Sequence, residues 1–299
     1  MSAEFFCVSN DKHFLGAAAL LNSLRAAGHD EPFHLVDCGL TARQRAAFAG
    51  HAHLIDAPRD ISPLMLKALG PLEVDPEIAV ILDADIVVQR PLTHLIGEKP
   101  VVFLNDLTER FEPEWIRFGY PRLERIPYLN SGQMIFPRSS GLLPLLQQGN
   151  ERMLEILHSE PAKCRVPTDP FYYTDQDVLN ALIGSLDPGD YVVSSEVAYW
   201  PFDEPCGDVP LLHHIMDKPW LKPLRPNPYT AAMTRLLASG PVDVPVDEIP
   251  ARLRPGALGS LARTGASVQH TVREHSRGRL GVRQRLAERR AAMTPPASA

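Results

Sequence analysis

The chain has 299 residues, of which 44% are hydrophobic and 22% charged, so its composition is that of an ordinary globular protein rather than a disordered or membrane-spanning one. The net charge is −6, but residues 251–299 hold ten arginines, no lysine and two glutamates, which gives this segment +8 and leaves −14 for the first 250 residues. An acidic body of this kind argues against nucleic-acid binding through a basic face.

Strands and helices alternate through the first third of the sequence. Apolar residues recur at strand or helix spacing, and Thr41 followed by Gln44 has the spacing of a capping box that opens a helix. The predicted strands cover 5–8, 33–36, 53–55 and 78–82, and the predicted helices cover 14–25, 41–50 and a short piece at 63–70. This alternation predicts an α/β fold with a Rossmann-like, doubly wound, mainly parallel sheet.

The middle of the chain continues the pattern less regularly. Further strands are predicted at 101–104 and 128–136, and further helices at 142–158 and 175–184. Residues 187–228 contain eight prolines, which predicts that this stretch consists mostly of loops lying across the sheet.

The composition changes again beyond about residue 240, where Pro, Gly, Ala and Arg dominate. We therefore expect one domain over 1–240 and a basic C-terminal segment over 241–299 that is partly helical or disordered. Apolar residues such as Val268 and Val272 among the arginines favour an amphipathic segment lying on anionic lipid, and a solvated, disordered tail fits the same composition. Residues 1–4 lack the features of a signal peptide, so the predicted location is the cytoplasm, with contact of the tail at the inner face of the membrane.

The run from Val80 to Val88 places two carboxylates, Asp83 and Asp85, inside an otherwise apolar strand. Residues two apart in a strand point to the same face, so the two side chains are expected to converge where the strand ends. Adjacent carboxylates beside a core need compensation, and a divalent metal that also grips a diphosphate would supply it. A strand-end pair that caps a turn or meets an arginine is the structural alternative.

Further motifs follow this pair in a fixed order. They are Tyr128-Leu129-Asn130-Ser131-Gly132, Thr174-Asp175-Gln176-Asp177, and Leu211-Leu212-His213-His214 before Lys218-Pro219-Trp220. Together with Asp83-Ala84-Asp85, this series resembles glycosyltransferase family 8, the retaining enzymes that include glycogenin and bacterial lipopolysaccharide galactosyltransferases. The resemblance covers roughly residues 4–222 and implies a GT-A fold, a nucleotide-sugar donor that is usually a UDP-sugar, and a divalent ion that is usually Mn²⁺.

In the family, the metal is held by the paired aspartates and by a histidine ahead of Lys-Pro-Trp. The resemblance therefore implies Asp83, Asp85 and His213 as ligands, with His214 as a competitor for the third position. Mixed carboxylate and imidazole ligation suits Mn²⁺ better than Mg²⁺, which remains an alternative. The spacing from His213 to Lys218 is one residue shorter than usual and lacks the family's glycine.

The resemblance also implies roles for residues around the donor. Gln176 lies near the anomeric carbon in the family, with Asp175 beside it, and these two are the catalytic candidates. Asp177 has the capping-box spacing from Thr174, which favours a structural role. Lys67 stands where the family commonly has an arginine, and a surface lysine is the alternative interpretation. The donor-binding candidates are Ser9, Asn10, Asp11, His13, Lys67, Asp83, Ala84, Asp106, Asn130, Ser131 and Lys218.

The function implied is metal-dependent transfer of a hexosyl group, with retention, to a carbohydrate or glycolipid acceptor of the kind found in bacterial cell-surface polysaccharide. Aromatic residues in 107–127 and 187–210 would either choose the acceptor or simply pack these loops. A non-catalytic nucleotide-sugar-binding protein is one alternative. A sugar nucleotidyltransferase is another, but the turn at 10–14 lacks the glycine-rich loop that such enzymes have after their first strand.

Overall fold

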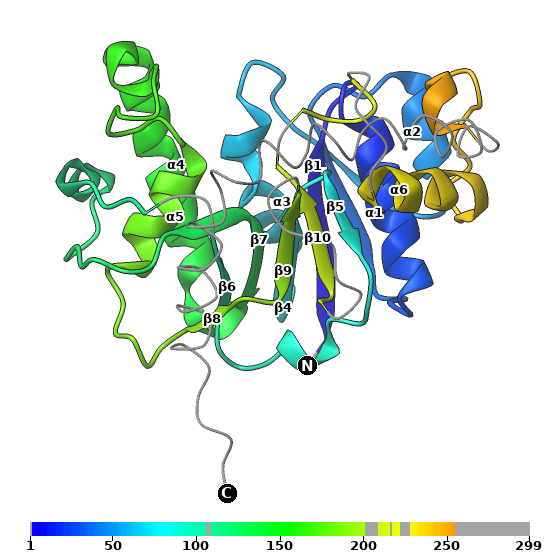
Figure 1. Ribbon diagram of the computed structural model, residues 1–299. Coiled ribbons are helices and arrows are strands. Elements are labelled where there is room, and N and C mark those ends of the chain that lie inside the picture. Colours follow the sequence, from blue (N-terminus) through cyan, green and yellow to red (C-terminus); the bar gives the residue numbers. More distant parts are fainter. Residues whose placement is uncertain (1, 106–108, 201–208, 216, 222–227, 255–299) are drawn as a thin grey trace, which may run out of the picture.

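A computed structural model describes residues 2–105, 109–200, 209–215, 217–221 and 228–254 of the chain. Two β-sheets form the centre, and helices cover them from both sides (Figure 1). The large sheet has seven strands in the order β3-β2-β1-β4-β7-β6-β8, and the small sheet has three in the order β5-β10-β9.

The large sheet confirms the predicted doubly wound architecture. Its strands are β1 (Ala3–Ser9), β2 (Phe33–Asp37), β3 (His53–Asp56), β4 (Ile78–Leu82), β6 (Val101–Leu104), β7 (Leu129–Pro137) and β8 (Val192–Ser194). Neighbouring strands pair in parallel except around β7, which runs antiparallel to both β4 and β6. The sheet is therefore mainly parallel, as the βαβαβ alternation predicted.

The small sheet adds short strands to the loops expected over residues 187–228. Besides β8, this stretch supplies β9 (Val197–Trp200) and β10 (Leu211–His214), and β10 pairs antiparallel with β5 (Ile86–Val88). The described prolines of this stretch, Pro188, Pro210, Pro219 and Pro228, lie outside its strands, so they interrupt no ladder. Strands of three or four residues are set by their pairing partners, which a local pattern does not contain.

Helices cover the two faces of the large sheet as separate layers. On one face lie α1 (Phe14–Ala26), α2 (Ala42–Phe48) and α6 (Pro228–Ser239), and on the other lie α3 (Leu69–Val74), α4 (Leu142–Ser159) and α5 (Asp175–Ile183). Alternating residues of β1 enter the two cores, because Phe5 packs with the α1 layer and Phe6 with the α4 and α5 layer. The capping box between Thr41 and Gln44 is confirmed, with both of its hydrogen bonds formed.

The described chain continues past α6 as residues 241–254. Val242, Val244, Ile249 and Leu253 are buried in the same core as α1 and α6. The predicted amphipathic stretch lies in 255–299, outside the described residues. In the part of the chain that the structure describes, none of the helices combines the length and apolar character needed to cross a membrane. The described cysteines Cys7, Cys38 and Cys164 are free thiols.

Candidate active site

The paired aspartates lie in the turn between β4 and β5. Strand β4 ends at Leu82, so the expectation that Asp83 and Asp85 share one strand face is wrong in its geometry. The turn is held by two backbone hydrogen bonds, from Asp83 N to Gly132 O (2.7 Å) and from Ile86 N to Asp83 O (3.1 Å). The two carboxylates still converge, because the tight turn brings them together beside β7 and β10.

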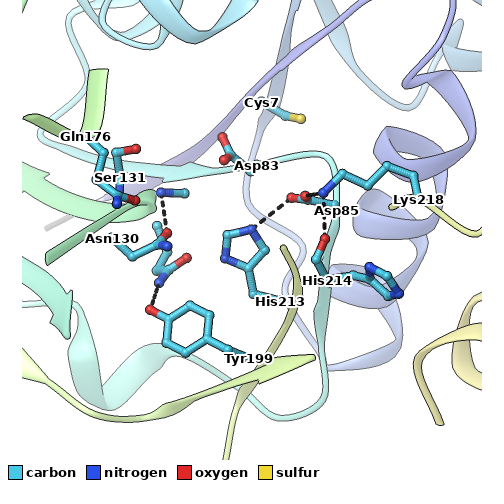
Figure 2. Close-up of polar contacts among 12 residues, drawn as sticks. Cys7, Asp83, Asp85, Asn130, Ser131, Gln176, Tyr199, His213, His214 and Lys218 are labelled. Atoms are coloured by element: carbon cyan, nitrogen blue, oxygen red, sulfur yellow. Dashed lines mark hydrogen bonds and ion pairs between the residues drawn. The ribbon is translucent and has the colours of Figure 1, made fainter. Parts of the chain in front are cut away.

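His213 completes a cluster with the two aspartates (Figure 2). One ligand atom from each of Asp83, Asp85 and His213 lies within 4.8 Å of the other two. The antiparallel pairing of β10 with β5 places His213 opposite Ile86, directly beside the turn. The ring of His214 points away and meets Tyr229 with 4.9 Å between ring centroids. Of the two candidate histidines, only His213 therefore faces the aspartates.

Two lysines neutralise the carboxylates. Lys67 is buried and its Nζ lies 2.8 Å from Asp83 Oδ1, 2.9 Å from Asp175 Oδ2 and 2.9 Å from Ser131 O. Lys218 Nζ pairs with Asp85 Oδ2 and donates to His214 O (2.6 Å). The interpretation of Lys67 as a surface lysine is thereby excluded, since its side chain is only 4% exposed.

Burial and these neighbours set the protonation of the site. Burial alone would lower the pKa of the Lys67 ammonium, but the charges of Asp175 and Asp83 outweigh it and raise the pKa above its ordinary value. Burial raises the pKa of Asp83, helped by the charge of Asp85 and opposed by that of Lys67. Burial would also raise the pKa of Asp85, but Lys218 and His213 hold it well below its usual range.

The cluster fits a divalent cation by its chemistry. Asp85 Oδ1 is buried, accepts no well-formed hydrogen bond among the described residues, and lies 3.1 Å from His213 Nε2. A carboxylate oxygen and an imidazole nitrogen that face each other in this way share a cation well. The backbone of β7 leaves room for the approach, since a Cβ on Gly132 would lie 2.4 Å from His213 Cε1 and 2.9 Å from Asp83 Oδ2. Two carboxylates and one imidazole are thus available as ligands.

Two cavities meet at Lys67, Asp83 and Asp85. The smaller, of about 170 Å³, is lined by the predicted donor-binding residues Ser9, Asn10, His13, Ala84 and Lys218, among others. The larger, of about 420 Å³, is lined by the predicted residues Asn130, Ser131, Asp175, Gln176 and His213, among others. Asp11 is exposed and outside both linings, with its Oδ1 accepting from Lys12 N (2.8 Å). Asp106 lies outside the described residues.

The wall of the larger cavity is cross-linked by polar side chains. Ser131 Oγ donates to Asp175 Oδ2 (2.7 Å), and Ser131 N donates weakly to Gln176 Oε1 (3.4 Å). Asn130 Oδ1 accepts from Gly132 N (2.8 Å), so its amide stays fixed at the cavity. These contacts join the start of β7 to the start of α5.

Asp177 lies behind this wall, and its predicted capping box is not formed. Thr174 has φ 48° and its side chain makes no cap hydrogen bond. Asp177 instead accepts from Tyr128 Oη (2.8 Å) and Tyr173 N (3.0 Å) and lies 3.2 Å from Arg110 Nε. The expected structural role holds, but through tertiary contacts. Burial raises the pKa of Asp177 to about 7, against the opposing charge of Arg110.

Several residues of the site were not singled out from the sequence. Leu64, Asn105, Tyr173 and Ile215 line the larger cavity. No spacing in the sequence distinguished them, because each reaches the cavity from a different segment of the chain. The aromatics of the two expected acceptor loops largely pack the interior instead, as the fully buried Trp115, Phe118 and Tyr199 do. Tyr199 lies against His213, with ring centroids 5.7 Å apart, and donates to Leu104 O (2.8 Å).

Comparison with known proteins gives matches among solved structures only. No family model and no curated protein matches the chain. An active-site mutant of LgtC, with glutamate in place of a glutamine, aligns with a TM-score of 0.59 and 20% identity over 82% of this chain and 98% of that chain. The galactosyltransferase LgtC in complex with donor and acceptor sugar analogs gives a TM-score of 0.57 at 20% identity over the same shares.

A third match is the glycosyltransferase GlyE of Streptococcus pneumoniae TIGR4, with a TM-score of 0.50 and 12% identity over 82% of this chain and 66% of that chain. At these identities the likeness concerns the fold. The chain therefore has the fold of these glycosyltransferases, which confirms the GT-A architecture expected from the motifs.

Proposed function

We propose that this protein is a metal-dependent glycosyltransferase that moves a hexosyl group from a UDP-sugar to a carbohydrate or glycolipid acceptor, with retention at the anomeric carbon. The observation that carries the proposal is the cluster of Asp83, Asp85 and His213 at the junction of two cavities. A nucleotide sugar needs such a division, because its diphosphate must reach the cation while nucleoside and sugar extend to either side.

The smaller cavity would hold the nucleotide side of the donor. Ser9 ends the first strand and Asn10 and His13 lie in the turn after it, at the carboxyl edge of the sheet where α/β folds bind ligands. The Lys218 ammonium would exchange its ion pair with Asp85 for one with the β-phosphate. In that position it would stabilise the departing diphosphate. A bound divalent cation, Mn²⁺ by preference, would supply Lewis-acid stabilisation of the same charge through Asp83, Asp85 and His213.

The larger cavity would hold the sugar and the approaching acceptor. Gln176 and Asp175 line it and are the residues to which we assign catalytic roles, beside an oxocarbenium-like sugar. Asn130 and Ser131 would orient the sugar hydroxyls, with Lys67 holding Asp175 in place. The likeness to LgtC supports this division, since one of its structures contains donor and acceptor sugar analogs and the other an active-site glutamine mutant.

The test is release of UDP from a panel of UDP-sugars, in Mn²⁺ and in EDTA, with an Asp85→Ala variant beside the unchanged protein. We expect slow hydrolysis of one donor, which EDTA and the substitution both abolish. Glu155→Ala serves as a control, because this exposed carboxylate pairs only with Arg152 on the same helix, α4, in the described structure. Retention is read from the anomeric configuration of the product by proton NMR.

Binding separates the proposal from its alternatives. Tight binding of UDP with Mn²⁺ but no turnover of any donor, with acceptor sugars present, would identify a non-catalytic nucleotide-sugar-binding protein. Release of pyrophosphate from UTP and a sugar phosphate would identify a nucleotidyltransferase. Failure of UDP to bind in the presence of Mn²⁺ would overturn the proposed function altogether.

A further inference from the structure

The segment after α6, residues 241–254, crosses from α1 to the edge of the smaller cavity, and we call it the C-terminal strap. It is anchored first at Asn22 on α1, whose Oδ1 accepts from Val242 N (2.9 Å). The approach is close, because a Cβ on Gly240 would lie 2.0 Å from Asn22 Cγ. The strap is thereby fixed to the same helix that packs beneath the aspartate turn.

The middle of the strap is fastened to α2, and Gln44 of that helix also reaches the turn after β1. Asp247 forms a bidentate pair with Arg43, at 2.6 and 2.7 Å. Gln44 Nε2 donates to Glu248 Oε2 (3.1 Å) and reaches Asp11 O (3.4 Å). Ile249 and Leu253 are buried, so the strap also contributes apolar contacts to the core.

The strap ends on the segment that carries Lys218. Arg252 Nε donates to Pro219 O (2.8 Å), and its Nη2 donates to Trp220 O (3.0 Å). A guanidinium suits two neighbouring carbonyl groups because its donors lie in one rigid plane. Arg252 therefore holds two successive peptide groups directly after Lys218.

The same short segment is joined to the site on its other side. Trp220 Nε1 donates to Lys12 O (2.8 Å), in the turn that leads from β1 to α1. The Trp220 ring packs against Gly16, where a Cβ would lie 2.7 Å from Cη2 of Trp220 and 2.2 Å from Ala84 O. Leu221 N closes the turn onto Lys218 O (3.0 Å). The backbone of Lys218 is thus fixed between Arg252 and the residues that line the smaller cavity.

We propose that Arg252 is a positioning residue for Lys218, and that the C-terminal strap is a working part of the nucleotide-diphosphate site rather than the start of a separate tail. The proposal rests on the proposed function. Arg252 fixes the peptide groups that follow Lys218, and the Lys218 side chain reaches Asp85 from this fixed backbone.

The expected consequence is a loss of donor binding when Arg252 is removed. Residues that orient a ligand-contacting group usually contribute about 10-fold to 100-fold to affinity, and we expect UDP binding with Mn²⁺ to weaken by about tenfold in Arg252→Ala. KM for the UDP-sugar should rise by a similar factor, with a smaller change in kcat, because Lys218 is retained but misplaced. Arg252→Lys keeps one charged donor and should recover part of the loss.

The experiment compares the full-length protein with Arg252→Ala, Arg252→Lys and Arg122→Ala. The last is a matched control, since Arg122 donates to two successive backbone carbonyl groups, Ser185 O (3.2 Å) and Leu186 O (2.7 Å), outside the strap and both cavities. Titration calorimetry measures UDP binding in Mn²⁺. Hydrogen exchange, without any ligand, measures protection of the amides of Lys218, Trp220 and Leu221. We expect Arg252→Ala to lose both affinity and protection, Arg252→Lys to recover part of each, and Arg122→Ala to keep both.

The two readouts separate this proposal from the proposed function. Unchanged exchange at 218–221 in Arg252→Ala would overturn the positioning role, whether or not UDP binds. Lost protection with unchanged UDP affinity in Arg252→Ala would also overturn it, because the turn would then be mobile without consequence for the ligand. Failure of the unchanged protein to bind UDP would overturn the proposed function. The assignment of Arg252 to a nucleotide site would then be overturned as well.

Discussion

The two walls of the site are built on different principles. The sugar-side wall centres on Lys67, whose side chain is 4% exposed and contacts Asp83, Asp175 and Ser131. The phosphate-side wall centres on Lys218, whose side chain is 18% exposed and whose turn is held mainly through backbone carbonyl groups. One lysine is surrounded by fixed partners, while the other has a partner that it can exchange for a ligand.

The difference between the walls explains how the two aspartates are tolerated in the protein without its ligands. Asp83 and Asp85 would repel each other if left bare, yet each already pairs with a lysine from one of the two walls. Breaking the pair on the sugar side leaves buried charges without compensation. Breaking the pair on the phosphate side leaves a carboxylate that faces a cavity, where water or a cation can replace the lysine. Substitution of Lys67 should therefore mainly reduce stability, whereas substitution of Lys218 should mainly change ligand binding.

The largest effect expected is that of Lys67→Met on folding. Removal of one partner from a buried ion pair typically destabilises a protein by about 3–5 kcal/mol, and here two carboxylates, Asp83 and Asp175, lose a buried cation together. Urea unfolding monitored by circular dichroism measures the loss. Lys163→Met is the matched control, because that lysine pairs with Glu114 and Glu160 at the surface. A midpoint for Lys67→Met equal to that of the control would remove the distinction between the walls.

A second prediction concerns Asp177, which supports the sugar-side wall from behind. Its pKa is raised from 3.8 to about 7, mainly by burial, so in the folded state it takes up a proton at a higher pH than in the unfolded chain. Its contribution to stability is therefore complete below about pH 4 and is lost as the pH rises through about 7. The loss is about 4 kcal/mol at most.

Asn at position 177 mimics the protonated acid, since its amide can donate to Tyr128 and its oxygen can accept from Tyr173 N. Asp177→Asn should thus show a flatter pH dependence of the free energy of unfolding between pH 4 and 7. Urea titrations at intervals of one pH unit provide the measurement. Parallel curves for the two proteins would show that Asp177 is ionised throughout this range, held by Arg110.

Much of this arrangement follows from local sequence. The strand pattern and the tight Asp83-Ala84-Asp85 run are local, and so is the polar start of α5 that brings Asp175 and Gln176 to the cavity. The capping box at Thr41 is equally predictable, because both partners lie within four residues of each other. Features encoded within one element can therefore be predicted from the sequence.

The remaining features depend on contacts between distant segments. His213 reaches the aspartates because β10 pairs with β5, more than a hundred residues away, and a strand of four residues among prolines carries little local signal. The choice of His213 over His214 follows from which face of that strand meets the turn. Asp177 has a capping spacing, but the positive φ of Thr174 and the hydroxyl of Tyr128 override it. The composition of the C-terminal region does not distinguish the strap from the tail that follows it. The strap is fixed by Asn22, Arg43 and Gln44, which lie about two hundred residues earlier in the sequence.

The smallest effect on folding is expected from Lys218→Met, and it tests the phosphate-side wall. Loss of the ion pair with Asp85 should cost less than loss of Lys67, about 1–3 kcal/mol, because Lys218 is 18% exposed and water can reach the freed carboxylate from the cavity. Removing the lysine frees Asp85, so Mn²⁺ should bind more tightly to the protein without nucleotide, as measured by electron paramagnetic resonance of free Mn²⁺. UDP binding in Mn²⁺ should instead weaken by about 10-fold to 100-fold, because a charge-assisted contact of about 1.5–3 kcal/mol is lost.

These opposite shifts are what distinguish an exchangeable lysine from a fixed one. Lys99→Met is the control, since Lys99 donates to Gly189 O at the surface and should alter neither affinity. Weaker Mn²⁺ binding in Lys218→Met would mean that the lysine supports the metal site rather than competing for Asp85. It would then resemble Lys67 in its role, and the two walls would differ only in exposure. Tighter Mn²⁺ binding with weaker UDP binding would show that the diphosphate draws Lys218 away from Asp85 and so admits the metal and the nucleotide together.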